Sequence, residues 1–141
     1  MWGLNPENVT LTLDLIGFLA RDVGDMVDAI ELLNEPAGFR GPPWPDTIRN
    51  FWQSGYEVVR DVAGVNITVV IEDAFLGVQS WQGFLTEPSA ANTLMDVVRL
   101  SPPPLPPFRI FPSLLTSLYK STSIKYLTIT SWDSRGLNIS V

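Results

Sequence analysis

The stretch IELLNEPAGF, residues 30–39, decides how the fold of this chain is interpreted. Its first half is apolar, which is typical of a strand inside a fold, whereas Glu35 stands where that strand should end. Side chains alternate along a strand, so Glu35 is expected on the same face as Glu31, with Asn34 on the other face. Such a carboxylate is either a polar residue leaving the core or a working acid, and this stretch alone leaves both interpretations open.

The composition limits the chemistry that the chain can perform. It has 141 residues, enough for one domain with a core, and it is 45% hydrophobic and 17% charged, as globular proteins are. It has no cysteine and no histidine, which excludes disulfides, thiolate metal sites, the commonest zinc sites and histidine-based triads. Acid–base chemistry must therefore come from carboxylates, tyrosines or lysines.

Charge and hydropathy limit the partners of the chain. The net charge is −6, which argues against a nucleic-acid partner, because such partners require a basic face. No apolar run reaches the roughly 18 residues of a membrane span. The first ten residues, MWGLNPENVT, lack the basic and apolar regions of a signal peptide, so the sequence predicts no export signal and leaves the location unknown.

The chain divides into two unlike parts near residue 97. Residues 1–96 hold 14 of the 15 acidic side chains, whereas residues 97–141 hold five of the nine basic ones. Six of the 12 prolines lie within residues 102–112, and serine and threonine are frequent beyond them. We therefore expect one domain over 1–96 and an irregular, poorly ordered Pro/Ser/Thr-rich tail over 97–141.

Two segments of the first part have helical periodicity. Within residues 7–26, apolar side chains recur at helical spacing at Leu11, Leu15, Phe18 and Leu19. Within residues 46–64, a second apolar face is formed by Ile48, Phe51, Trp52 and Val59. Asp46 is the expected N-cap of this second helix, and Gly64 its stop.

Strands are expected between and after these helices. Apolar or β-branched segments occur at residues 29–34, 66–75 and 92–97. Alternation of helices with apolar strands is typical of an α/β fold, in which a parallel sheet is covered by helices.

Four blocks of sequence carry a resemblance to a known family. They are IELLNEPAGFRGPPW (30–44), IRNFWQSGYEVVRDVAG (48–64), VVIEDAFLGVQSWQGFLT (69–86) and LMD (94–96), in that order and with tight spacing. Together they closely resemble the fungal exo-β-1,3-glucanases, or glucan 1,3-β-glucosidases, of glycoside hydrolase family 5. The resemblance covers residues 8–96, about two thirds of the chain.

The resemblance implies a TIM barrel that hydrolyses β-1,3-glucosidic bonds of glucans with retention, using two glutamates and no cofactor or metal. Glu35 matches the acid/base of the family, and Asn34 matches the asparagine that contacts the sugar 2-hydroxyl. An acid that must be protonated near neutral pH is favoured by a desolvated position, which suits the mouth of a barrel.

Three further residues are candidates for substrate binding. Asp73, Trp81 and Phe84 follow the next predicted strand, where loops of the family line the sugar cleft. The aromatic rings could stack on glucose, and core packing is the alternative. Glu31 and Glu72 lie within predicted strands and are interpreted as structural.

The resemblance ends after LMD. In the family this strand continues into a motif with histidine and tyrosine, and the strand of the nucleophile follows. Here Val98 and Leu100 stand near those positions, and nothing downstream resembles the nucleophile strand. We therefore expect a fragment of a TIM barrel, with about three parallel strands and flanking helices, that lacks its nucleophile and is inactive alone.

Two non-catalytic roles remain as alternatives. One is a glucan-binding remnant that uses Trp44, Trp81 and Phe84. The other is a polyproline ligand at SPPPLPPF, residues 101–108, for SH3- or profilin-like domains. No obligate protein partner is implied. Members of the family are usually secreted or associated with the cell wall, and sequons begin at Asn8, Asn66 and Asn138.

Overall fold

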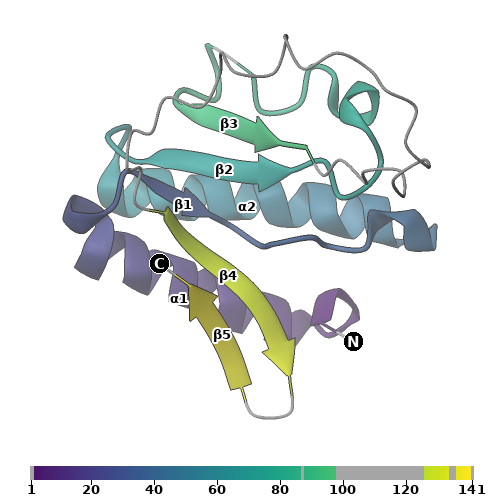
Figure 1. Ribbon diagram of the computed structural model, residues 1–141, viewed down its shortest axis with the longest axis horizontal. Helices are drawn as coiled ribbons and strands as arrows, with labels where there is room; N and C mark the ends of the chain where they lie inside the picture. Colours follow the sequence, from purple (N-terminus) through teal and green to yellow (C-terminus); the bar gives the residue numbers. More distant parts are fainter. Residues whose placement is uncertain (1, 87, 98–125, 134–135, 141) are drawn as a thin grey trace, which may run out of the picture.

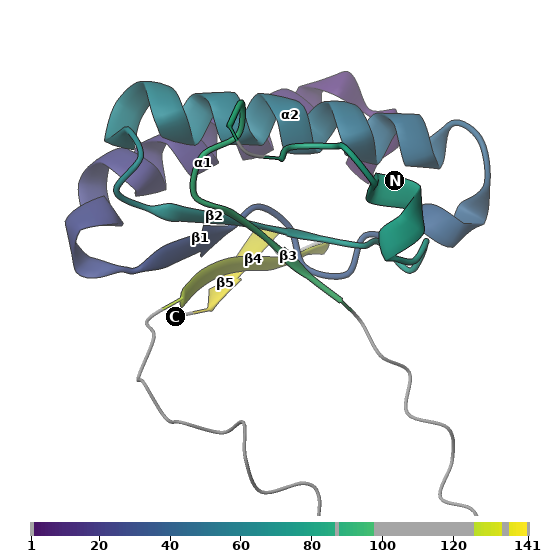
Figure 2. The same ribbon diagram turned by 90° about the horizontal axis from the view of Figure 1, so that it is seen from above.

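Two helices cover one side of a sheet in the computed structural model of this chain (Figures 1 and 2). The structure describes residues 2–86, 88–97, 126–133 and 136–140. None of the helices within these residues combines the length and the apolarity that crossing a membrane requires.

Helix α1, Pro6–Val23, begins where the sequence supplies a cap. The Asn5 side chain accepts a hydrogen bond from the Glu7 N–H at 2.9 Å, and Pro6 occupies the first turn. The predicted apolar face was wrong in part, because Leu11 and Phe18 are 50% and 51% exposed. The buried residues are Thr12, Ile16, Gly17, Leu19 and Ala20.

The position of helix α2, Trp44–Ala63, decides which face of α1 is buried. A Cβ at Gly17 would lie 3.0 Å from Val58, so the glycine lets the two helices approach closely. Because α1 is apolar around a wide arc, periodicity could not show which part of the arc meets α2.

The buried face of α2 is the predicted one, with Ile48, Phe51, Trp52 and Val59 all buried. The helix starts two residues before Asp46, so Asp46 lies in its first turn and the prediction of an N-cap was wrong. Pro43 and the cis Pro42–Pro43 bond precede the start. Gly64 ends the helix as predicted, with φ 65° and its N–H donating to the Arg60 carbonyl at 3.0 Å.

The three predicted parallel strands are confirmed as β1 (Ala29–Glu31), β2 (Thr68–Glu72) and β3 (Thr93–Asp96). Strand β1 is shorter than predicted, because the chain leaves the ladder after the Leu32 N–H bonds the Val70 carbonyl. Short 3₁₀ helices fill the connections: η1 (Trp2–Leu4), η2 (Gly24–Met26), η3 (Gly38–Arg40) and η4 (Val78–Trp81).

Two further strands lie in the segment expected to be irregular. Strand β4, Tyr126–Asp133, pairs in parallel with β1, and β5, Gly136–Ser140, pairs antiparallel with β4, giving the order β3-β2-β1-β4-β5 (Figure 1). The expectation of an irregular tail was therefore wrong for these residues. YLTIT has the β-branched composition of a strand, and the second edge of β1 offers it backbone partners.

Residues 98–125, which include the polyproline tract at 101–108, lie outside the described residues, as do residues 134–135 and 141. The domain boundary near residue 97 stays a prediction.

The core lies between the helices and one face of the sheet. Ile30, Leu32 and Ile71 are fully buried on this face, together with Phe51 and Trp52 of α2. A Cβ at Gly55 would meet Leu32 at 2.7 Å, so α2 lies directly against the end of β1. The residues that alternate with these along each strand therefore project from the other face of the sheet, which the helices do not cover.

Candidate functional site

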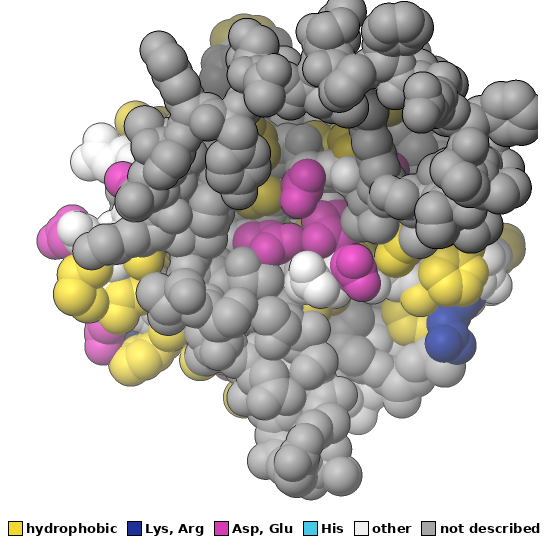
Figure 3. All heavy atoms as spheres, in the orientation of Figure 1, with side chains coloured by type: hydrophobic (Ala, Val, Ile, Leu, Met, Phe, Trp, Pro, Cys, Tyr) yellow, Lys and Arg dark blue, Asp and Glu magenta, His cyan; other side chains and the backbone are white. Residues whose placement is uncertain are grey.

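Register between the strands places three carboxylates on the helix-free face of the sheet. Glu31 lies opposite Val70, and two residues farther along β2, Glu72 lies opposite Asp96. Neighbouring residues of parallel strands share a face, so Glu31, Glu72 and Asp96 all belong to this side. Figure 3 shows acidic side chains gathered near the centre of the same face.

Glu72 is the buried member of this group, with 2% of its surface exposed. Burial raises the pKa of its carboxyl to about 8, and the hydrogen bond with the Glu31 side chain contributes in the same direction. The negative charges of Glu31 and Asp96 add to the rise, whereas the hydrogen bond from the Glu35 backbone opposes it. Glu72 is therefore mainly protonated at pH 7, and it can donate a hydrogen bond to Glu31.

Glu35 lies in a turn after the strand, so the predicted alternation from Glu31 to Glu35 was wrong. The strand ends at Glu31, and Glu35 has φ 47°, in the left-handed region that non-glycine residues seldom adopt. Its backbone N–H donates to Glu72 Oε2 at 2.7 Å, while its side chain is exposed. The turn thus fixes the backbone of Glu35 and leaves its carboxyl accessible.

Asn34 precedes Glu35 in this turn and is half-buried. The structure therefore brings Asn34 and Glu35 together at the carboxyl end of β1, where parallel sheets bind ligands. The roles of both residues toward a sugar stay predictions.

Asp73 is close in sequence to this edge but has a structural task. Its side chain is buried, and its Oδ1 accepts the Phe75 N–H at 3.1 Å. Its carbonyl accepts the indole N–H of Trp81 at 2.8 Å. These bonds hold a turn in which Ala74 and Phe75 both have positive φ, 52° and 60°. This geometry favours a role in shaping the turn over contact with substrate.

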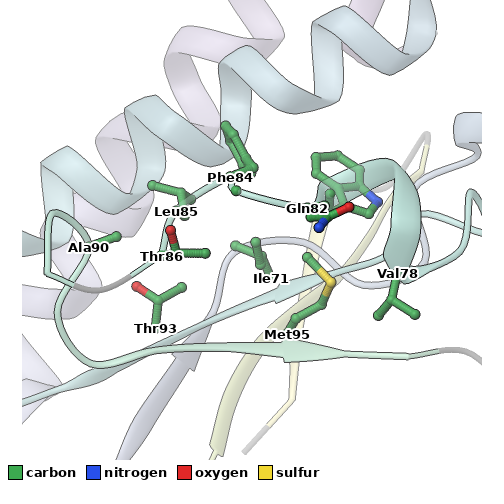
Figure 4. A pocket seen from close by; sticks show the side chains of 11 residues that line it. Ile71, Val78, Gln82, Phe84, Leu85, Thr86, Ala90, Thr93 and Met95 are labelled. Carbon is green, nitrogen blue, oxygen red and sulfur yellow. The ribbon is translucent and has the colours of Figure 1, made fainter.

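Trp81 and Phe84 lie away from the acidic face. They line a cavity of about 480 Å³ together with Ile71, Thr93 and Met95, which belong to the opposite face of β2 and β3 (Figure 4). Trp81 is 2% exposed, so neither face of its ring is free for a sugar.

The Arg49 guanidinium of α2 covers both aromatic rings, with its carbon 4.8 Å from each ring centroid. The structure thus favours the packing alternative for Trp81 and Phe84, and it does not bring them together with Glu35.

Comparison with known proteins finds several curated glucan 1,3-beta-glucosidases, whereas no family model matches the chain. Glucan 1,3-beta-glucosidase from Schwanniomyces occidentalis is 35% identical over 97 residues, which cover 64% of this chain and 22% of the relative. Glucan 1,3-beta-glucosidase 2 from Wickerhamomyces anomalus is 36% identical over 85 residues, covering 57% and 18%. Glucan 1,3-beta-glucosidase from Blumeria graminis is 37% identical over 92 residues, covering 63% and 21%.

The chain is related in sequence to glucan 1,3-β-glucosidases. It spans about a fifth of the length of these relatives. The match covers the larger part of this chain, so the sequence relationship applies to most of its residues. The activity of a complete glucosidase does not follow from a match to a fifth of its length.

Two residues of the site were missed by sequence reasoning. The structural interpretation of Glu72 agrees with its burial, but its contact with the Glu35 turn was not predicted, although Glu72 ends β2 as Glu35 follows β1 and the carboxyl ends of neighbouring parallel strands meet at one edge. Phe39 is 65% exposed four residues after Glu35, and its ring meets Phe75 edge-on with centroids 5.6 Å apart. It is the aromatic ring that this turn offers to solvent.

The carboxylates of this face are not arranged as a metal site. Within the part of the chain that the structure describes, no group of three or more side chains of the metal-binding types is placed to hold an ion.

Proposed function

We propose that this chain carries the acid/base half of a retaining β-1,3-glucosidase site of the family 5 type, with Glu35 as acid/base and Asn34 beside the sugar 2-hydroxyl. The observation that supports this most is the exposed carboxyl of Glu35 on a fixed backbone at the carboxyl end of β1. The relationship to glucan 1,3-β-glucosidases supplies the substrate class, a β-1,3-glucan.

Retaining hydrolysis requires Glu35 to protonate the glycosidic oxygen as the bond to C1 breaks. It later requires Glu35 to take a proton from water. A second carboxylate, about 5–5.5 Å away in retaining enzymes, must attack C1 from the other side. Glu72 does not suit that task, because it is buried, mainly protonated at pH 7 and bonded to Glu31. We propose that this chain lacks the nucleophile, and that β1 to β3 correspond to consecutive strands of a TIM barrel.

An exposed aromatic ring strengthens the proposal for this edge of the sheet. Phe39 lies on the same turn as Glu35 and is open to solvent, as sugar-stacking rings must be. We propose Phe39, in place of Trp81 and Phe84, as the ring that contacts glucan.

Azide can test the acid role, because it replaces a missing nucleophile. With phenyl β-glucoside, azide attacks C1, the C1–N bond forms as the C1–O bond breaks, and Glu35 gives its proton to the leaving phenoxide. The expected product is α-glucosyl azide, detected by NMR, with no hydrolysis when azide is omitted.

Glu35→Gln should abolish this reaction of phenyl glucoside but spare much of that of 2,4-dinitrophenyl glucoside, whose leaving group needs no proton. Glu57→Gln, at an exposed glutamate of α2, is the matched control and should react as the parent chain does. Equal losses for both glucosides, or no azide product from either, would contradict the proposal.

A further inference from the structure

The turn that carries Glu35 needs an external support. A non-glycine residue in the left-handed region costs about 1–2 kcal/mol, so the conformation persists only where other contacts hold it. The backbone N–H of Glu35 reaches across from β1 to the end of β2 and donates to Glu72 Oε2 at 2.7 Å. This contact joins residues that are 37 positions apart in the sequence.

Glu72 is itself held in place by its surroundings. It is buried and its carboxyl is hydrogen-bonded to the Glu31 side chain of β1. Among the described residues, the charged groups that act on it are Glu31 on β1 and Asp96 on β3, with the Glu35 backbone above. A buried carboxyl beside two other acidic side chains is stable only if one carboxyl of the group keeps a proton and donates it in a hydrogen bond to a neighbour.

A second contact ties the same two turns together. Gly38, just after the Glu35 turn, packs on the turn after Glu72, and a Cβ there would lie 2.6 Å from the Ala74 carbonyl oxygen. Phe39 and Phe75 meet edge-on at the same place. The turn that follows β1 therefore packs against the turn at the end of β2.

We propose that Glu72 is a positioning residue for Glu35: its buried carboxyl, linked through a proton to Glu31, anchors the Glu35 N–H and fixes the left-handed turn that aims the Glu35 side chain. The acid/base role of Glu35 rests on the proposed function, whereas the anchoring of its backbone by Glu72 does not. Glu72 itself touches no substrate in this arrangement. It acts through the backbone of Glu35.

The direct test follows the Glu35 amide by NMR in the ¹⁵N-labelled chain of 141 residues. Its resonance should titrate with a midpoint near pH 8, because it reports the ionisation of Glu72. Glu72→Gln keeps an acceptor for the amide and a donor for Glu31 but does not titrate, so the signal should show no transition near pH 8. Glu31→Gln should lower the midpoint, because it removes a negative charge beside Glu72.

Glu72→Leu removes the acceptor at similar volume. Hydrogen exchange of the Glu35 amide should become about tenfold faster, as for the loss of one buried hydrogen bond, while the Ile71 and Val69 amides keep their protection. If this variant fails to fold, the titration of the parent chain and of the Gln variants decides the matter. A Glu35 amide that does not titrate, or that titrates alike in Glu72→Gln, overturns the proposal.

The azide reaction distinguishes the positioning role of Glu72 from the acid/base role of Glu35. In the azide reaction, Glu72→Leu should lower kcat about tenfold with little change in KM, and Glu72→Gln should recover part of the loss. Glu35→Gln should leave the amide titration in place, since the backbone N–H remains. No azide product together with a normal titration would remove the proposed function and keep the positioning role. A normal kcat in Glu72→Leu would remove the positioning role alone.

Discussion

Burial of the Glu72 carboxyl links the stability of the chain to pH. Its pKa rises from 4.5 to about 8 on folding, so the folded state binds more protons than the unfolded state between these values. Stability should therefore be highest below pH 4.5 as far as this group is concerned, and should fall as the pH rises to about 8. The expected slope is at most about 1.4 kcal/mol per pH unit.

Urea denaturation at pH values from 5 to 9 measures this slope, and Glu72→Gln should flatten it because the amide does not titrate. The control is Glu57→Gln, whose side chain is exposed. Parallel pH curves for the parent chain and Glu72→Gln would show that Glu72 is not the group responsible.

Gly38 gives a second prediction at the scale of one residue. A methyl group there would meet the Ala74 carbonyl oxygen at 2.6 Å, and a backbone atom can move only if its turn moves. Gly38→Ala should cost about 1–3 kcal/mol of unfolding free energy and shift the Glu35 amide resonance.

Gly17→Ala is the matched comparison, because its neighbour is the Val58 side chain at 3.0 Å and alanine favours a helix. It should change the free energy of unfolding much less than Gly38→Ala, when both are measured in urea. Equal effects would mean that the contact with Ala74 does not constrain the turn.

At the scale of elements, Arg60 joins the last turn of α2 to the starts of two strands. Its guanidinium donates hydrogen bonds of 2.7–3.0 Å to four backbone carbonyls that lie just after α2, just before β2 and just before β3. They are the carbonyls of Gly64, Ile67, Ala91 and Asn92. The Tyr56 ring packs on its face, 4.7 Å from the guanidinium carbon.

Arg60→Lys should therefore lower the free energy of unfolding by about 2 kcal/mol, because an ammonium cannot replace the planar fork. Arg21→Lys, at an exposed arginine of α1, should have almost no effect in the same urea experiment. If both changes are equally mild, the four carbonyl contacts of Arg60 contribute little to stability.

These elements also show what the sequence could and could not predict. Periodicity located both helices and the three parallel strands, because their apolar residues recur where the core requires them. It could not tell that Leu11 and Phe18 face outward, since that depends on where α2 packs. Nor could it pair Glu72 with Glu35, because a left-handed turn and a contact over 37 residues leave no local pattern.

At the scale of the molecule, β4 occupies an edge of β1 that a barrel would give to the preceding strand. Ala29, Ile30 and Glu31 are paired with β2 on one side and with β4 on the other. The strand beneath the Glu35 turn is thus an interior strand, with its backbone groups enclosed on both edges.

A chain that ends at residue 97 should lose this protection. Exposing one edge of β1 should speed hydrogen exchange of the β1 amides that bond to β4, and an open apolar edge should promote association with other copies. Exchange followed by mass spectrometry, and sedimentation at several concentrations, measure the two effects against the chain of 141 residues. Unchanged exchange in β1 together with a monomeric shortened chain would show that β4 does not protect this strand. If exchange becomes faster only in β1 and is unchanged in α2, β4 stabilises the sheet at β1 and does not stabilise the helices.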